Sequence, residues 1–130
     1  PSGAISDLSR VFSGSAAANA RSRNNYPISM ILYNTTFTFH NPLLGSFSEW
    51  LRERWLPEAH AAGLTDSTVA RLMAEIDPEA TAFAVQGHFA NEDAAEMWHD
   101  GRGAELLSEL SARYGERVLP FTTFMEVIDL

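Results

Sequence analysis

Residues 30–40 read MILYNTTFTFH, and residues 118–127 near the other end of the chain read VLPFTTFMEV. Both segments are rich in β-branched and aromatic residues, and their side chains alternate between two faces, as in β-strands. Apolar side chains occur on both faces, and one face also carries Asn, Thr and His. Because neither face can be left fully to water, we expect a sheet with helices on one side and a second subunit on the other.

The overall composition is that of one globular domain. The chain has 130 residues, of which 45% are hydrophobic and 20% are charged. It contains no apolar run near the roughly 20 residues that a membrane span requires, so we expect no membrane partner. There is no cysteine, which excludes disulfides, thiolate metal sites and a cysteine nucleophile. This fits a reducing compartment, and we expect a cytoplasmic protein.

Charge divides the chain into two parts. Residues 1–29 contain three arginines and one aspartate, whereas the remainder contains six arginines and sixteen acidic residues, and lysine is absent. An acidic body repels a phosphate backbone, so nucleic acid is not an expected partner. Residues 1–29 also lack hydrophobic periodicity and a secretory apolar stretch. We therefore expect a disordered or non-native leader at 1–29 and a single domain at 30–130.

Two helices are predicted between the strands. Residues 46–49 (SFSE) match a capping box that would begin a helix, and Pro57 should kink or restart this helix before Gly63 ends it. Its buried stripe would be Phe47, Trp50, Leu51 and Trp55. Asn91 caps the second predicted helix, which residues 100–103 (DGRG) interrupt before it resumes and ends at Gly115.

Residues 68–76 fit either a helical stripe or a strand. A turn signal at 77–79 (DPE) and a strand-like segment at 81–89 follow directly, so a hairpin favours a strand at 68–76. The resulting order is β-α-β-β-α-β, which is typical of an α+β, ferredoxin-like fold with a four-stranded antiparallel sheet and two helices on one face. Pro120 cannot donate a hydrogen bond to a neighbouring strand, so it suits an edge strand.

The chain also resembles a known family. The resemblance rests on residues 33–37 (YNTTF), on Trp50-Leu51 and Leu56-Pro57, on residues 115–119 (GERVL), and on Phe121-Thr122-Thr123 with Glu126. These resemble a small bacterial family of domains of unknown function in the dimeric α/β-barrel superfamily. The resemblance covers residues 30–130 and implies a ferredoxin-like subunit whose sheet pairs with that of a second copy. It implies no established activity.

Side-chain parity suggests a cleft on the sheet face away from the helices. The candidate residues are Asn34, Thr36, His40, Gln86, His88 and Glu126, and among them Asn34, His88 and Glu126 could converge between the sheet and a partner subunit. A carboxylate beside an imidazole can support proton transfer. The same groups could equally satisfy one another, or water, at a dimer interface.

The sequence leaves two functions open. The first is an uncharacterised homodimeric domain that binds a small molecule or a protein partner in the inter-sheet space, without a cofactor. The second, by analogy with dimeric α/β-barrel enzymes, is a cofactor-independent monooxygenase or a haem-handling enzyme that uses Asn34, Trp98 and His99. The four histidines show no HExxH-type spacing, so no metal site is predicted, and no catalytic residue is assigned.

Overall fold

The computed structural model describes residues 29–74 and 77–130, so the predicted leader, apart from Ser29, lies outside the described residues. Four strands form one antiparallel sheet in the order β2-β3-β1-β4. Their bounds are β1 Ile31–His40, β2 Thr65–Arg71, β3 Ala80–Phe89 and β4 Val118–Glu126. This is the predicted ferredoxin-like topology, and β4, which contains Pro120, is an edge strand as expected.

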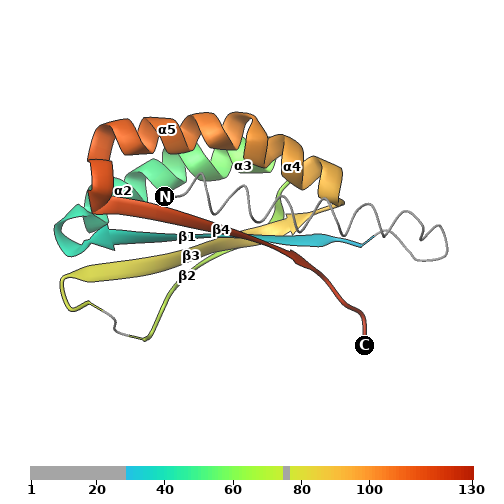
Figure 1. Ribbon diagram of the computed structural model, residues 1–130, viewed down its shortest axis with the longest axis horizontal. Helices are drawn as coiled ribbons and strands as arrows, with labels where there is room; N and C mark the ends of the chain where they lie inside the picture. Colours follow the sequence, from blue (N-terminus) through green and yellow to red (C-terminus); the bar gives the residue numbers. More distant parts are fainter. Residues whose placement is uncertain (1–28, 75–76) are drawn as a thin grey trace.

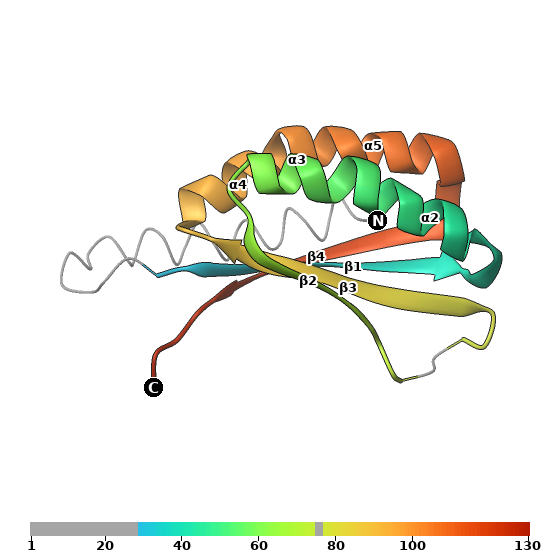
Figure 2. The ribbon, with the colours of Figure 1, turned by 180° about the vertical axis from the view of Figure 1, so that it is seen from behind.

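The helices cover one face of this sheet (Figures 1 and 2). Between β1 and β2 the chain forms the 3₁₀ turn η1 Asn41–Leu43, the helix α2 Leu44–Trp50, the π turn η2 Leu51–Trp55 and the helix α3 Leu56–Ala61. Between β3 and β4 it forms α4 Glu92–Asp100, α5 Arg102–Tyr114 and the 3₁₀ turn η3 Gly115–Arg117. Each of the two predicted helices is therefore divided into shorter helical segments.

The first helical segment begins earlier than the capping box predicts. The 3₁₀ turn η1 with Pro42 leads directly into α2, and Ser46 lies inside that helix. Its hydroxyl is hydrogen-bonded to the Tyr114 hydroxyl at 2.7 Å instead of capping a helix end. The predicted capping box is therefore wrong. Pro57 does restart the helix, because it lies in the first turn of α3 just after the π turn.

The signals at the other helix ends are confirmed. The Asn91 side chain accepts a hydrogen bond from the Ala94 backbone N–H at 2.9 Å, which caps α4. The interruption between α4 and α5 falls at Gly101. Gly63 and Gly115, which follow α3 and α5, have positive φ angles of 112° and 59°, a conformation that glycine adopts without steric cost.

The core between the helices and the sheet is aromatic. Phe37 on β1 is fully buried, and its ring centroid lies 5.2 Å from that of Phe47 and 5.4 Å from that of Trp55. The Phe37–Trp55 pair is edge-to-face, and such a pair adds to the free energy gained by burying the rings. The predicted stripe of the first helix, Phe47, Trp50, Leu51 and Trp55, is buried as a whole.

Strand β2 approaches β3 unusually closely at Gly87. A Cβ atom on Gly87 would lie 2.8 Å from both Leu64 Cγ and the Thr65 carbonyl oxygen. The register shifts between Thr65 and Thr68, and Asp66 in this irregular stretch has a φ angle of 51°. The strand predicted at 68–76 is thus confirmed in kind, but it starts at Thr65 and ends at Arg71, while residues 75–76 lie outside the described part.

Within the described ranges, no helix is long and apolar enough to cross a membrane.

Candidate functional site

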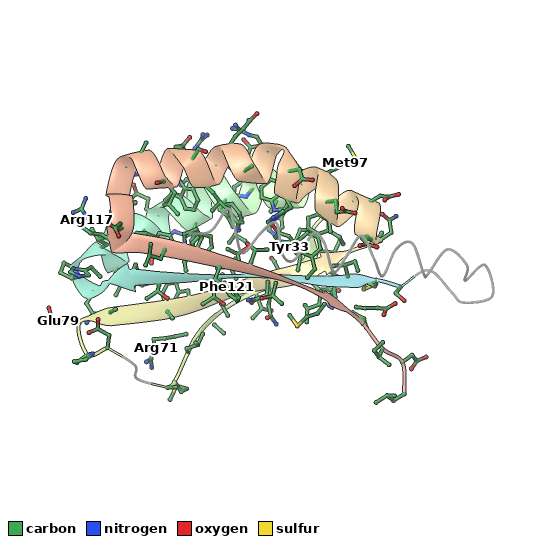
Figure 3. All side chains as sticks on the ribbon, viewed as in Figure 1. Tyr33, Arg71, Glu79, Met97, Arg117 and Phe121 are labelled. Carbon is green, nitrogen blue, oxygen red and sulfur yellow. The ribbon has the colours of Figure 1, made fainter. Side chains whose placement is uncertain are left out.

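One sheet face points away from the helices, and we call it the open sheet face. Figure 3 shows the two sides of the sheet, with Tyr33 on the side of the helices and Phe121 on the opposite side. Directly opposed residues of paired strands share a face, so the register defines its members. They are Leu32, Asn34, Thr36, Thr38 and His40 of β1; Ala80, Ala82, Ala84, Gln86 and His88 of β3; Leu119, Phe121, Thr123 and Met125 of β4; and Thr65, Thr68 and Ala70 of β2.

The open sheet face contains no Asp, Glu, Arg or Lys at any of these positions. It also exposes large apolar side chains, since Leu119 is 51% exposed, Phe121 46% and Met125 38%. Several exposed large apolar side chains on one face of a strand are typical of an interaction surface. The open sheet face is therefore a better candidate for an interface than for a water-exposed surface.

Several of the charged groups form pairs on the outer surface of the helices. Arg54 Nη2 lies 2.6 Å from Glu109 Oε1, and Arg102 Nη2 lies 2.9 Å from Glu58 Oε2. The hydrogen bond from Arg54 lowers the pKa of Glu109 to about 2. Both pairs are exposed, so they contribute little to stability. They lie on the helix layer, on the other side of the sheet from the open sheet face.

Five of the six predicted cleft residues lie on the open sheet face. Asn34 of β1 is directly opposed to Gln86 of β3, and His88 is opposed to Leu32 one row away. The Asn34 side-chain N–H donates to Thr36 Oγ1 at 3.0 Å. His40 is on the same face at the far end of β1, opposite Ala80.

Glu126 does not join this group. It is opposed to Ile31, and Ile31 is buried toward the helices. In the β1–β4 register, odd-numbered residues of β1 face even-numbered residues of β4, so Asn34 is opposed to Thr123. The predicted convergence of Asn34, His88 and Glu126 is therefore wrong, because it assumed a register in which Glu126 shared their face.

His88 contacts the irregular part of β2. Its Nδ1 atom is buried, lies 3.8 Å from Asp66 Oδ2, and has no hydrogen-bond partner among the described residues. Asp66 is largely exposed, with 82% of its side chain accessible. At 3.8 Å the two atoms are too far apart to share a hydrogen bond.

The residues of the enzyme alternative lie on both sides of the sheet. Trp98 and His99 are buried between α4 and the sheet, where the Tyr33 hydroxyl and His99 Nδ1 form a 2.9 Å hydrogen bond. Burial raises the pKa of Tyr33 above its ordinary value. Asn34 points the other way, to the open sheet face. The structure therefore does not bring Asn34 together with Trp98 and His99 within one chain.

Sequence reasoning missed several residues that complete the open sheet face. Phe121, Met125 and Thr123 on β4 and Thr68 on β2 share it with Asn34 and Gln86. The alternation of β4 was readable from its sequence. The register between the paired strands, which assigns each set of alternating residues to a face, could not be predicted from the sequence.

Other sites are less prominent. A shallow hollow of about 190 Å³ lies at the β2–β3 turn, bordered by Arg71, Asp77 and Asn41. None of Asn34, Gln86 and His88 lines it. Among residues 29–74 and 77–130, no three His, Asp or Glu side chains gather in a way that could hold a metal ion.

Residues 30–128 match the model of a family described as a domain of unknown function, DUF4286. No curated protein matches the chain. Among solved structures, a candidate antibiotic biosynthesis monooxygenase from Bacillus cereus is similar, with 14% identity and a TM-score of 0.51 over 78% of this chain and 96% of its own. A dimeric ferredoxin-like protein from an uncultured marine organism aligns with 15% identity and a TM-score of 0.48 over 78% of this chain and 98% of its own. At this identity the first likeness shows the fold alone.

Proposed function

The chain belongs to the DUF4286 family of domains of unknown function, and from that premise we propose that it is a homodimeric binding module. Two copies associate through their open sheet faces, and the space between the sheets holds a small molecule or a protein partner. The observation that carries the proposal is the composition of the open sheet face, which is free of charged residues yet exposes Leu119, Phe121 and Met125.

The net charge of the chain favours this face over the others. Each copy carries a formal charge of −8, so two copies repel one another wherever their acidic surfaces meet. The open sheet face has no carboxylate at its paired positions, and burying its apolar side chains against an identical face would remove them from water. A two-fold arrangement needs only one such self-complementary surface per copy.

The inter-sheet space has polar groups that could orient a bound molecule. Asn34 and Gln86 supply amides, and His88 supplies an imidazole close to Asp66. Ligand sites commonly combine an apolar lining with a few polar groups of this kind. Asn34 and His99 lie on opposite sides of the sheet, so the geometry gives no support to the oxygenase or haem-handling alternative.

The test of the dimer is the mass of the full chain in solution. We expect light scattering at tens of micromolar to give twice the chain mass of 14.4 kDa. Phe121→Glu places a carboxylate on the open sheet face and should yield a monomer, because a buried uncompensated charge is strongly unfavourable. Met97→Glu is the matched control, since Met97 is a 77% exposed apolar residue on α4. It should remain a dimer. A monomeric wild type, or equal disruption by both variants, would overturn the proposal.

A further inference from the structure

A row of polar side chains crosses the open sheet face from one edge to the other. Thr123 on β4 is opposed to Asn34 on β1, Asn34 is opposed to Gln86 on β3, and Gln86 is opposed to Thr68 on β2. We call these four residues the polar row. The next row on one side is less polar and consists of Phe121, Thr36, Ala84 and Ala70.

The polar row is not fully satisfied within one chain. The Asn34 amide N–H donates to Thr36, but Asn34 Oδ1 is buried and has no hydrogen-bond partner among the residues described. The Gln86 side-chain amide is partly exposed and makes no hydrogen bond to another described residue. Covering the face with apolar groups would remove the water from this amide, at a substantial cost in free energy. The occupant of this face must therefore offer hydrogen-bonding groups to its centre.

We propose that the occupant is the polar row of a second copy, and that pairing of the two rows sets the register of the dimer. This inference rests on the proposed homodimer and names the side chains that fix its geometry. A side-chain amide carries both donors and acceptors, so Asn34 and Gln86 can complement the same residues across a two-fold axis. They stand on the two central strands, β1 and β3, so a two-fold axis through the middle of the open sheet face would pass beside them.

The polar row would act as a specificity device. Apolar rows alone can slide past one another with little change in buried area, whereas a displaced amide loses its hydrogen bonds in a dry interface. A single buried Asn fixes the register of coiled coils in the same way. Association would thus draw its strength from Leu119, Phe121 and Met125, and its alignment from Asn34 and Gln86.

A charge exchange at Gln86 tests the pairing directly. Gln86→Glu and Gln86→Lys should each raise the dimer dissociation constant at least about tenfold, because like charges then meet near the axis. An equimolar mixture should form heterodimers at concentrations where each variant alone is monomeric, as measured by sedimentation velocity. Ser111→Glu adds the same charge on the exposed side of α5 and serves as the control. It should leave the constant within about twofold of wild type.

A distance measurement tests the register. The chain has no cysteine, so Ser111→Cys introduces one labelling site per copy on the exposed side of α5. Electron spin resonance on the labelled dimer should give one narrow distance distribution. With Asn34→Leu and Gln86→Leu added, the dimer should persist and the distribution should broaden or split.

The outcomes separate the two proposals. A monomeric wild type overturns both of them. A wild-type dimer that tolerates both Gln86 charge variants, forms no preferred heterodimer and keeps a narrow distribution with both leucines overturns the polar-row pairing alone. Circular dichroism of each variant excludes loss of the fold as the cause of dissociation.

Discussion

Tyr33 places a phenol in the core between the sheet and the helices. Its side chain is 3% exposed, and its hydroxyl is hydrogen-bonded to His99 at 2.9 Å. The Phe89 and Phe124 rings pack edge-on against it, with centroids at 5.5 and 5.2 Å. Burial disfavours the phenolate, so the pKa of Tyr33 is higher in the folded than in the unfolded chain.

The raised pKa of Tyr33 predicts that the folded protein loses stability at alkaline pH. A raised pKa means that the folded state holds the Tyr33 proton more tightly than the unfolded state does. The contribution of the neutral phenol to the free energy of unfolding is therefore complete below about pH 10 and declines above it. The free energy of unfolding of the wild type should fall more steeply than that of Tyr33→Phe, by about 1.4 kcal/mol per pH unit. Urea unfolding from about pH 9 to about pH 11.5 measures both slopes. Parallel slopes would show that Tyr33 does not titrate in this way.

At the scale of single residues, the sequence predicted faces within a strand but not between strands. Alternation along β1 correctly placed Phe37 toward the helices and Asn34 away from them. Glu126 was assigned to the wrong face because its position depends on the β1–β4 register. Register depends on pairing across the sheet, and a one-residue shift moves every side chain of a strand to the other face.

The absence of a side chain at Gly87 on β3 allows the start of β2 to pack closely against it. Leu64, just before β2, is buried and occupies the space that a side chain at position 87 would need. The Thr65 carbonyl oxygen approaches the same point. Glycine in a strand costs conformational entropy, but it permits such close contact between backbones.

Gly87→Ala should therefore destabilise the fold. The added Cβ would lie within 2.9 Å of three atoms of Leu64 and Thr65, and such overpacking typically costs about 1–3 kcal/mol. Gly45→Ala is the matched control, because a Cβ there meets nothing within 4 Å and Gly45 lies in helix α2. It should be neutral or stabilising by up to about 1 kcal/mol. Urea midpoints that move together for the two variants would contradict this interpretation.

At the scale of elements, the residues that favour the start or end of a helix predicted most helix ends correctly. Asn91 caps α4, Pro57 lies in the first turn of α3, and Gly63 follows its end with a positive φ angle. The capping box at Ser46 was misleading because Pro42 had already begun the helical segment, and Tyr114 provides Ser46 with another partner. That partner is distant in sequence, so local pattern could not reveal it.

At the scale of the whole molecule, charge and apolar surface are separated by the sheet. Arg54, Glu109, Arg102 and Glu58 lie on the helix layer, while the open sheet face has no charged side chain at its paired positions. The order of strands and helices in the sequence was sufficient to predict this layered architecture. The composition of the second layer became clear only when the register was known.

The separation of charged side chains from the open sheet face predicts how salt affects the association of two copies. Two copies of net charge −8 repel one another, and the paired positions of the open sheet face carry no Asp, Glu, Arg or Lys that could form an ion pair between copies. The dimer dissociation constant should therefore fall as ionic strength rises from about 0.01 M to about 0.15 M, where the Debye length shortens from about 30 to about 8 Å. Sedimentation equilibrium at a series of salt concentrations measures the trend. A dissociation constant that rises with salt would point to ionic contacts instead.

The two lateral strands of the sheet limit how far assembly can proceed. On β2 the irregular stretch around Asp66 disturbs the ladder, and on β4 Pro120 lacks a hydrogen to offer a neighbour. Chains therefore have little opportunity to add side by side into a continuous ribbon. In the proposed dimer, stacking would use up the one open sheet face of each copy. Assembly would then stop at two copies instead of growing into a fibre.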